Sequence, residues 1–269
     1  MCIRDSYEWI SLRGKGAMSS SSGNTVGPIE ALRLVPPEIL RFLVANSKPS
    51  KAIEFDTGMG LVNLADEYER LCARDLAGEM EAENLSRRKR VQLEDAMVAL
   101  DLSVVHEDQD SVATSVSFRH LSLLAQVKPE DEAVWDSLRS TGSIDQPTEA
   151  LKDRLIRMRS WIASEHFPDE MRITLLEAPS AAALNELTVD QRKVLVALET
   201  NLRSADWTAE GITEAFKSTA TEAAVSMRDV YRASYALFMG TERGPRLAPI
   251  LANCDRETMV ELVRRSQVV

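Results

Sequence analysis

The stretch best suited to holding a phosphate group is the run of small and polar residues from 14 to 28. Backbone N–H groups and Ser hydroxyls in such a loop can line a phosphate. A P-loop needs Gly five positions before its second Gly and Ser or Thr directly after its Lys, but this chain has Trp9 and Gly16 at those positions. The run is therefore not a P-loop, and its composition alone favours a flexible linker.

For other residues that could take part in chemistry, type and spacing favour structural or solvent-exposed roles. The segment 106–110, His-Glu-Asp-Gln-Asp, lacks the ligand spacing of a calcium loop, so we interpret it as a solvated turn and expect no metal site. Arg154, Arg157 and Arg159 alternate with an apolar stripe and are interpreted as the outer face of a helix. One basic run on a predicted helix is a candidate for nucleic-acid binding, although such runs are usually a solvated face: Arg87, Arg88, Lys89 and Arg90.

Length, charge and cysteine content limit the class of protein. The 269 residues carry 32 Lys and Arg against 42 Asp and Glu, and the net charge of −10 excludes a uniformly basic coat for nucleic acid. The three cysteines have no paired spacing, which argues against a disulfide framework or a Cys zinc site and indicates a reducing, cytosolic compartment. No apolar run approaches the roughly 18 residues of a membrane span, and the N-terminus lacks the apolar core of a secretion signal.

The hydrophobic pattern predicts that the chain is nearly all helix from about residue 28 onward. Pro28 and Pro36-Pro37 are placed to open two helices, because the first helical position does not need its N–H. A long helical stretch is predicted over about 61–100. Residues 7–13 are predicted to be the only strand.

In the last third of the chain, local signals mark the ends of helices. Thr188 and Gln191 have the spacing of a capping box, which predicts that a helix begins there. Gly240 is placed to end a helix over about 226–239 in the left-handed conformation. Asp255 is expected to cap the final helix.

Short motifs follow one another in a particular order along the chain. They are Tyr7-Glu8-Trp9-Ile10, the loop from Gly14 to Asn24, Val35-Pro36-Pro37-Glu38-Ile39-Leu40-Arg41, Ser47-Lys48-Pro49 with Phe55-Asp56, and Asp66-Glu67-Tyr68-Glu69-Arg70-Leu71. The order and spacing resemble the class I lysyl-tRNA synthetases, from about residue 7 to the end. Residues 240–247, Gly-Thr-Glu-Arg-Gly-Pro-Arg-Leu, resemble a turn in the C-terminal helical domain that glutamyl-type relatives share.

The resemblance implies a role for the small-residue loop. Five of its residues correspond to the Lys-Met-Ser-Lys-Ser signature, a mobile loop that closes over ATP after the last Rossmann strand: Ala17, Met18, Ser19, Ser20 and Ser21. Ala17 and Ser20 replace the two lysines, whose cations act on the triphosphate as charge develops on pyrophosphate. Lys15 is the nearby cation and a candidate phosphate contact. No catalytic residue is assigned, because the family's His-Ile-Gly-His type motif has no counterpart.

The fold class that the resemblance implies is all-α with a short Rossmann remnant. Residues 1–27 correspond to the end of the catalytic Rossmann domain, 28–104 to a helical stem-contact unit, and 105–269 to an α-helix-cage unit that binds the tRNA anticodon. The implied function is that of a lysine–tRNA ligase, which activates lysine with ATP, accompanied by Mg²⁺, and transfers it to tRNA(Lys). No membrane or DNA partner is expected. This chain by itself is expected to be an inactive portion of such an enzyme.

Arg243 and Arg246 are the candidate tRNA contacts in the C-terminal unit. Gly240 ends one helix and Gly244-Pro245 fix a turn, so two planar guanidinium groups are held where they can reach phosphate or an unpaired base. A structural role is the alternative, in which Arg243 pairs with Glu242 or Asp255 and Arg246 caps a helix end. The alternative function is a non-catalytic helical module that binds RNA or protein.

Overall fold

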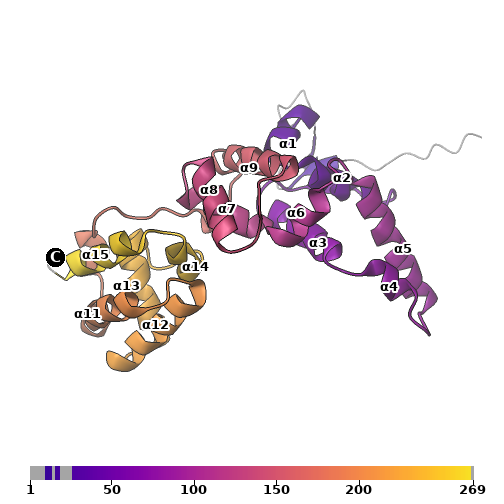
Figure 1. Ribbon diagram of the computed structural model, residues 1–269. Helices are drawn as coiled ribbons and strands as arrows, with labels where there is room; N and C mark the ends of the chain where they lie inside the picture. The colour runs from indigo at the N-terminus through magenta and orange to yellow at the C-terminus, as the bar shows by residue number, and fades with distance from the viewer. Residues whose placement is uncertain (1–9, 14–15, 19–25, 268–269) are drawn as a thin grey trace, which may run out of the picture. The chain divides into compact units, whose positions relative to one another are not determined.

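The computed structural model in Figure 1 describes residues 10–13, 16–18 and 26–267. The chain forms two compact units, residues 1–168 and 169–269. Most described residues are helical, which confirms the predicted fold class. Among these residues, no helix is both long enough and apolar enough to cross a membrane.

A small sheet lies in the first unit. It contains β1 (Ile10–Leu12), β2 (Gly16–Ala17) and β3 (Ile53–Phe55), in the order β2-β1-β3. β1 pairs antiparallel with β2 and parallel with β3, with Leu12 opposite Phe55. The prediction that residues 7–13 hold the only strand was wrong, since it missed both the two-residue β2 and β3. The strand β3 is three residues long, too short for its alternation of buried Ile53, exposed Glu54 and buried Phe55 to stand out as a pattern.

Two proline-initiated helices precede β3 in the chain, and both were predicted from their prolines. They are α1 (Pro28–Leu34) and α2 (Pro37–Ala45), each with Pro in its first turn. Ile39 and Phe42 of α2 are completely buried.

The predicted single helix over about 61–100 is in fact three: α3 (Met59–Cys72), α4 (Leu76–Met80) and α5 (Arg87–Leu102). Local caps separate them. The carboxylate of Asp75 accepts from the N–H of Gly78 at 2.9 Å, and the hydroxyl of Ser86 accepts from the N–H of Lys89 at 3.2 Å. Each capping residue begins a new helix. The apolar pattern that predicts one continuous helix is therefore divided among three.

The remaining helices of the first unit are α6 (Gln109–Ser115), α7 (Phe118–Val127), α8 (Asp131–Ser140) and α9 (Glu149–Ile162). α9 packs against α1, α6 and α7, and α7 also packs against α3. Trp161 lies between Phe118 and Phe167, with ring centroids 5.4 and 4.7 Å away. Residues 105–168 therefore share a core with residues 28–104.

This shared core places the border between compact units later than the predicted border at 104/105. The border lies between Pro168 and Asp169. The division into 1–27, 28–104 and 105–269 remains a prediction about functional parts, because compactness reports packing and not function.

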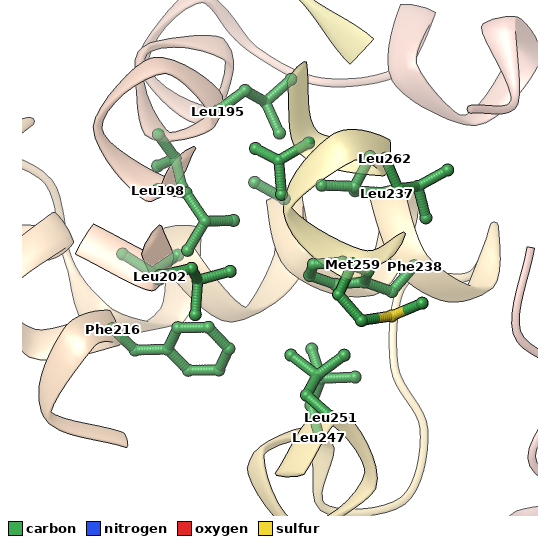
Figure 2. Close-up of a cluster of buried hydrophobic side chains, with 14 of the residues drawn as sticks. Leu195, Leu198, Leu202, Phe216, Leu237, Phe238, Leu247, Leu251, Met259 and Leu262 are labelled. Carbon is green, nitrogen blue, oxygen red and sulfur yellow. The ribbon is translucent and has the colours of Figure 1, made fainter. Parts of the chain in front are cut away.

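The second unit is helical throughout its elements: α10 (Ala181–Asn185), α11 (Val189–Ser204), α12 (Ala209–Glu222), α13 (Met227–Met239), α14 (Leu247–Ala252) and α15 (Arg256–Ser266), after the 3-10 turn η2 (Asp169–Met171). α11 packs against α12, α13 and α15. Figure 2 shows the core that these helices share, with Leu198 and Leu202 from α11, Phe216 from α12 and Met259 from α15.

Three predicted helix ends in this unit are confirmed. The capping box is complete, since Thr188 accepts from the N–H of Gln191 and Gln191 accepts from the N–H of Thr188. Gly240 ends α13 with φ of 67°, a conformation that an L side chain rarely adopts. Asp255 caps α15 by accepting from the N–H of Thr258 at 2.8 Å.

Candidate functional site

The signature-like loop begins beside an ion pair. Arg13, directly after β1, donates from Nη1 to Oδ2 of Asp56 at 2.8 Å, and its N–H donates to the carbonyl of Phe55 at 3.2 Å. Arg13 and Asp56 follow the carboxyl ends of two parallel strands. In open α/β sheets this edge is where ligands bind.

Asp56 also determines how α3 begins. Its two carboxylate oxygens accept from the N–H groups of Gly58 at 2.8 Å and Gly60 at 2.9 Å. A Cβ at Gly60 would lie 2.3 Å from Cβ of Asp56, so this arrangement requires glycine. The indole N–H of Trp161 donates to the carbonyl of Thr57 at 2.6 Å. The edge from which the loop departs is therefore attached to α3 and α9.

The structure describes part of the loop that the resemblance singled out. Ala17 belongs to β2, and Met18 is half-buried. Lys15, Ser19, Ser20 and Ser21 lie outside the described residues. The roles of all these residues toward ATP stay predictions.

The predicted tRNA contacts lie on a turn that α13 holds in place. The hydroxyl of Tyr235 donates to the carbonyls of Gly244 at 3.1 Å and Pro245 at 2.7 Å. Burial raises the pKa of Tyr235 above its ordinary value. Gly244 lies against Tyr235, and a Cβ there would be 3.3 Å from the ring. The turn is therefore fixed by its own carbonyls and by the lack of a side chain at Gly244.

Arg243 and Arg246 are both exposed on this turn. Neither forms an ion pair within the part of the chain that the structure describes. Glu242, which the structural alternative offered to Arg243, pairs instead with Arg232. Arg246 occupies the N-cap position of α14, but its side chain makes no capping hydrogen bond. Both guanidinium groups are thus free to meet a ligand.

A surface hollow of about 680 Å³ lies beside Arg246, and the sequence interpretation missed it. Its lining includes Tyr231, Tyr235, Lys217 and Pro249. The two tyrosine rings come from successive turns of α13, with centroids 6.4 Å apart. Their spacing of four residues was the available signal, since such residues share one helix face. Aromatic rings beside cationic side chains can stack a base and contact its phosphate.

The basic run on α5 has the character of a solvated face. Arg87, Arg88 and Arg90 are exposed, while Nζ of Lys89 lies 3.7 Å from Glu79. Arg74 pairs with the same carboxylate at 2.6 Å and holds the pKa of Glu79 below its ordinary value. This run lies in the first compact unit and the Arg243 turn in the second, so neither unit by itself brings the two together.

Arg154 was wrongly interpreted as part of an outer helix face. It is 1 % exposed, and it meets Glu38 and Glu69 inside the first unit. Both glutamates belong to motifs that carry the family resemblance, but a charged residue in a motif gives no signal of burial. In the described residues, no group of three His, Cys, Asp or Glu side chains is arranged to hold a metal ion.

Two protein families match this chain, one in its N-terminal region and one in its C-terminal region. The family described as tRNA synthetases class I (K) matches residues 3–96, and the anticodon binding domain family matches residues 123–265. The lysine–tRNA ligase of Thermoplasma volcanium is 28% identical over 258 residues, which cover 96% of this chain and 48% of the relative.

Two further relatives have the same name. The lysine–tRNA ligases of Archaeoglobus fulgidus and Methanopyrus kandleri are each 30% identical, over 261 and 275 residues, and the match covers 96% of this chain and 47% or 46% of the relative. The chain spans about half the length of the curated relatives it matches. It therefore belongs to the class I lysyl-tRNA synthetase family, with residues 123–265 in the anticodon binding domain family.

Proposed function

We propose that this chain supplies the tRNA-binding helical part of a lysine–tRNA ligase, the activity named for its relatives. The observation that carries the proposal is the fixed turn with two unpaired guanidinium groups beside a tyrosine-lined hollow. Both lie within the residues that match the anticodon binding domain.

The chemistry of the turn suits unpaired RNA. Proteins recognise single-stranded RNA by stacking its bases on aromatic rings and by contacting base edges and phosphates. Tyr231 offers an aromatic surface in the hollow, and Arg246 lines the same hollow. Arg243 lies three residues before Arg246 on the exposed turn and is proposed to contact the adjoining phosphate. One unpaired nucleotide of tRNA(Lys) is the proposed ligand.

The net charge of −10 repels RNA at long range, so binding depends on local contacts. Each phosphate contact releases counterions from the RNA. The proposed binding should therefore weaken steeply as the salt concentration rises.

The signature-like loop is proposed to contact ATP, which would arrive as its Mg²⁺ complex, a substrate of the complete enzyme. Lys15, Met18, Ser19 and Ser21 would supply the contacts. The chain contains no His-Ile-Gly-His type motif, and we propose that by itself it does not form lysyl-adenylate. A cytoplasmic location remains a prediction from the cysteine content.

The test compares two double variants that change the charge equally. Arg243→Glu with Arg246→Glu alters the turn at the C-terminal end of α13. Lys193→Glu with Arg228→Glu alters the opposite end, where Gln191 of α11 donates to Asp229 of α13 at 3.0 Å. The 13 residues of α13 place these ends about 18 Å apart along the helix.

Affinity for unmodified tRNA(Lys) is measured at low salt by filter binding or fluorescence anisotropy. The turn variant should bind about tenfold or more weakly, because charge-assisted contacts are lost, while the control variant retains most of the affinity. Equal losses in the two variants would show a general charge effect. No loss in a folded turn variant would show that the turn is structural. Either result would overturn the proposal.

A further inference from the structure

Three charged side chains meet in the interior of the first unit. Nε of Arg154 on α9 donates to Oε1 of Glu38 on α2 at 2.7 Å, and both side chains are 1–2 % exposed. Nη1 of Arg154 lies 3.5 Å from Oε1 of Glu69 on α3, whose side chain is 10 % exposed. The N–H of Phe118, at the start of α7, donates to the same Glu69 oxygen at 2.7 Å. The cluster thus involves four helices.

The cluster joins parts of the chain that different family models match. Glu38 and Glu69 belong to residues 3–96, and Arg154 to residues 123–265. Two further contacts connect α7 and α9 to α3 or to the residues just before it. Arg119 of α7 pairs with Asp66 of α3 at 2.7 Å, and Trp161 of α9 donates to the carbonyl preceding α3, as described above. Through these contacts α7 and α9 are attached to α2 and α3.

The charges of the cluster do not balance when both carboxyls are ionised. One guanidinium then faces two carboxylates, and the interior holds a net charge of −1. Neither Nη1 nor Nη2 of Arg154 has a hydrogen-bond partner among the described residues, so the guanidinium is hydrogen-bonded directly to Glu38 alone. An uncompensated charge in a protein interior is costly, and a proton on one carboxyl removes it.

Glu69 is the group placed to take that proton. Burial raises its pKa to about 7, outweighing the lowering by Arg154 and by the Phe118 N–H. The other charged groups facing it are Asp66 on its own helix, which raises the pKa, and Arg119 from α7, which lowers it. Glu38 lies across Arg154 and keeps the direct hydrogen bond.

We propose that Glu38, Arg154 and Glu69 form a proton-sensitive clamp, in which uptake of one proton strengthens the attachment of α7 and α9 to α2 and α3. With Glu69 protonated, Arg154 and Glu38 make a balanced pair and Glu69 still accepts from Phe118. With Glu69 ionised, the buried excess charge weakens the same contacts. The clamp lies within the first unit and does not depend on the proposed binding of tRNA.

The test uses the full 269-residue chain and its variant Glu69→Gln. Glutamine is uncharged at every pH and keeps an oxygen that can accept from Phe118. Between about pH 6 and pH 8, melting of the first unit should move to lower temperature in the unchanged protein by a few degrees Celsius, because Glu69 loses its proton in this range. Glu69→Gln should remove that shift. The three histidines are present in both proteins, so their titration cancels in the comparison.

A second variant separates a proton-sensitive clamp from simple packing. In Glu38→Gln, Glu69 is the one carboxylate left beside Arg154 among the described residues, so the ionised pair is balanced. The titration of Glu69 should therefore move to lower pH. The readout is NMR of chains with ¹³C-labelled glutamate carboxyls, in which Glu69 is the resonance missing from Glu69→Gln. The proposal is overturned if Glu69 titrates like an ordinary glutamate, if Glu38→Gln leaves its titration unchanged, or if the melting shift persists in Glu69→Gln.

Discussion

The hydroxyl of Tyr235 donates to the carbonyl of Pro245 at 2.7 Å, and this contact fastens the turn carrying Arg243 and Arg246 to α13. A second hydrogen bond reaches Gly244 at 3.1 Å. The position of the turn that carries both guanidinium groups therefore depends on the phenol of Tyr235.

Replacing Tyr235 with Phe should loosen the turn without emptying the hollow. We expect the free energy of unfolding to fall by about 0.5 to 1.5 kcal/mol and the affinity for tRNA(Lys) to fall severalfold. Tyr231→Phe is the matched control, because it keeps the ring that lines the hollow. Urea unfolding and tRNA binding measure the two effects. A stability loss in Tyr235→Phe with undiminished affinity would contradict the role assigned to the turn.

Gly240→Ala should strain the end of α13. Gly240 and Gly142 both have positive φ, 67° and 68°, so alanine at either site should cost about 1 to 2 kcal/mol of stability. Gly142 lies in the first unit, where nothing surrounds its missing Cβ within 4 Å. We expect only Gly240→Ala to weaken tRNA binding. Equal tRNA affinities of the two variants would show that the turn takes no part in RNA recognition.

Asp56→Ala should destabilise the first unit more than Arg13→Ala does. Asp56 accepts from two backbone N–H groups at the start of α3, and losing two such hydrogen bonds costs about 1 to 2 kcal/mol. The Arg13 side chain is 61% exposed, so its ion pair should contribute less than about 1 kcal/mol. Thermal unfolding measures both. Similar losses of stability in the two variants would mean that the ion pair, and not the hydrogen bonds to Gly58 and Gly60, stabilises this edge.

The pH dependence of stability at Glu69 has a definite sign. Its folded pKa of about 7 lies above the ordinary 4.5, so the folded state binds a proton more tightly than the unfolded state. The resulting stability is fully present below pH 4.5 and is lost as the pH rises from there through 7. At about pH 8, Glu69→Gln should therefore be more stable than the unchanged protein, by about 1 to 3 kcal/mol. Glu94→Gln, on the exposed face of α5, is the control and should change little.

Lysine-dependent pyrophosphate exchange should be absent from the purified 269-residue chain. Closing the loop on ATP requires a Rossmann surface beneath it. Exchange above a control without enzyme would contradict this. In a longer protein that includes such a domain, Ser20→Lys should raise the rate if the missing cation limits it, because a lysine stabilises the charge that develops on pyrophosphate.

Local signals in the sequence determine where many helices of this protein begin and end. Prolines open α1 and α2, the Thr188 capping box opens α11, and Gly240 ends α13. Each signal acts through neighbouring backbone groups, so a short stretch of sequence contains the whole interaction. The ordered motifs likewise indicated the family without reference to the fold.

Only the tertiary structure decided which distant residues meet. β3 exists because Ile53 and Phe55 pair with β1, some 43 positions earlier in the chain. The burial of Arg154 depends on carboxylates 116 and 85 residues away, so its helix alone gave the wrong face. The hollow beside Arg246 combines α12, α13 and the start of α14. Such arrangements arise when helices pack, because burial and charge pairing depend on what the neighbouring elements bring to each side chain.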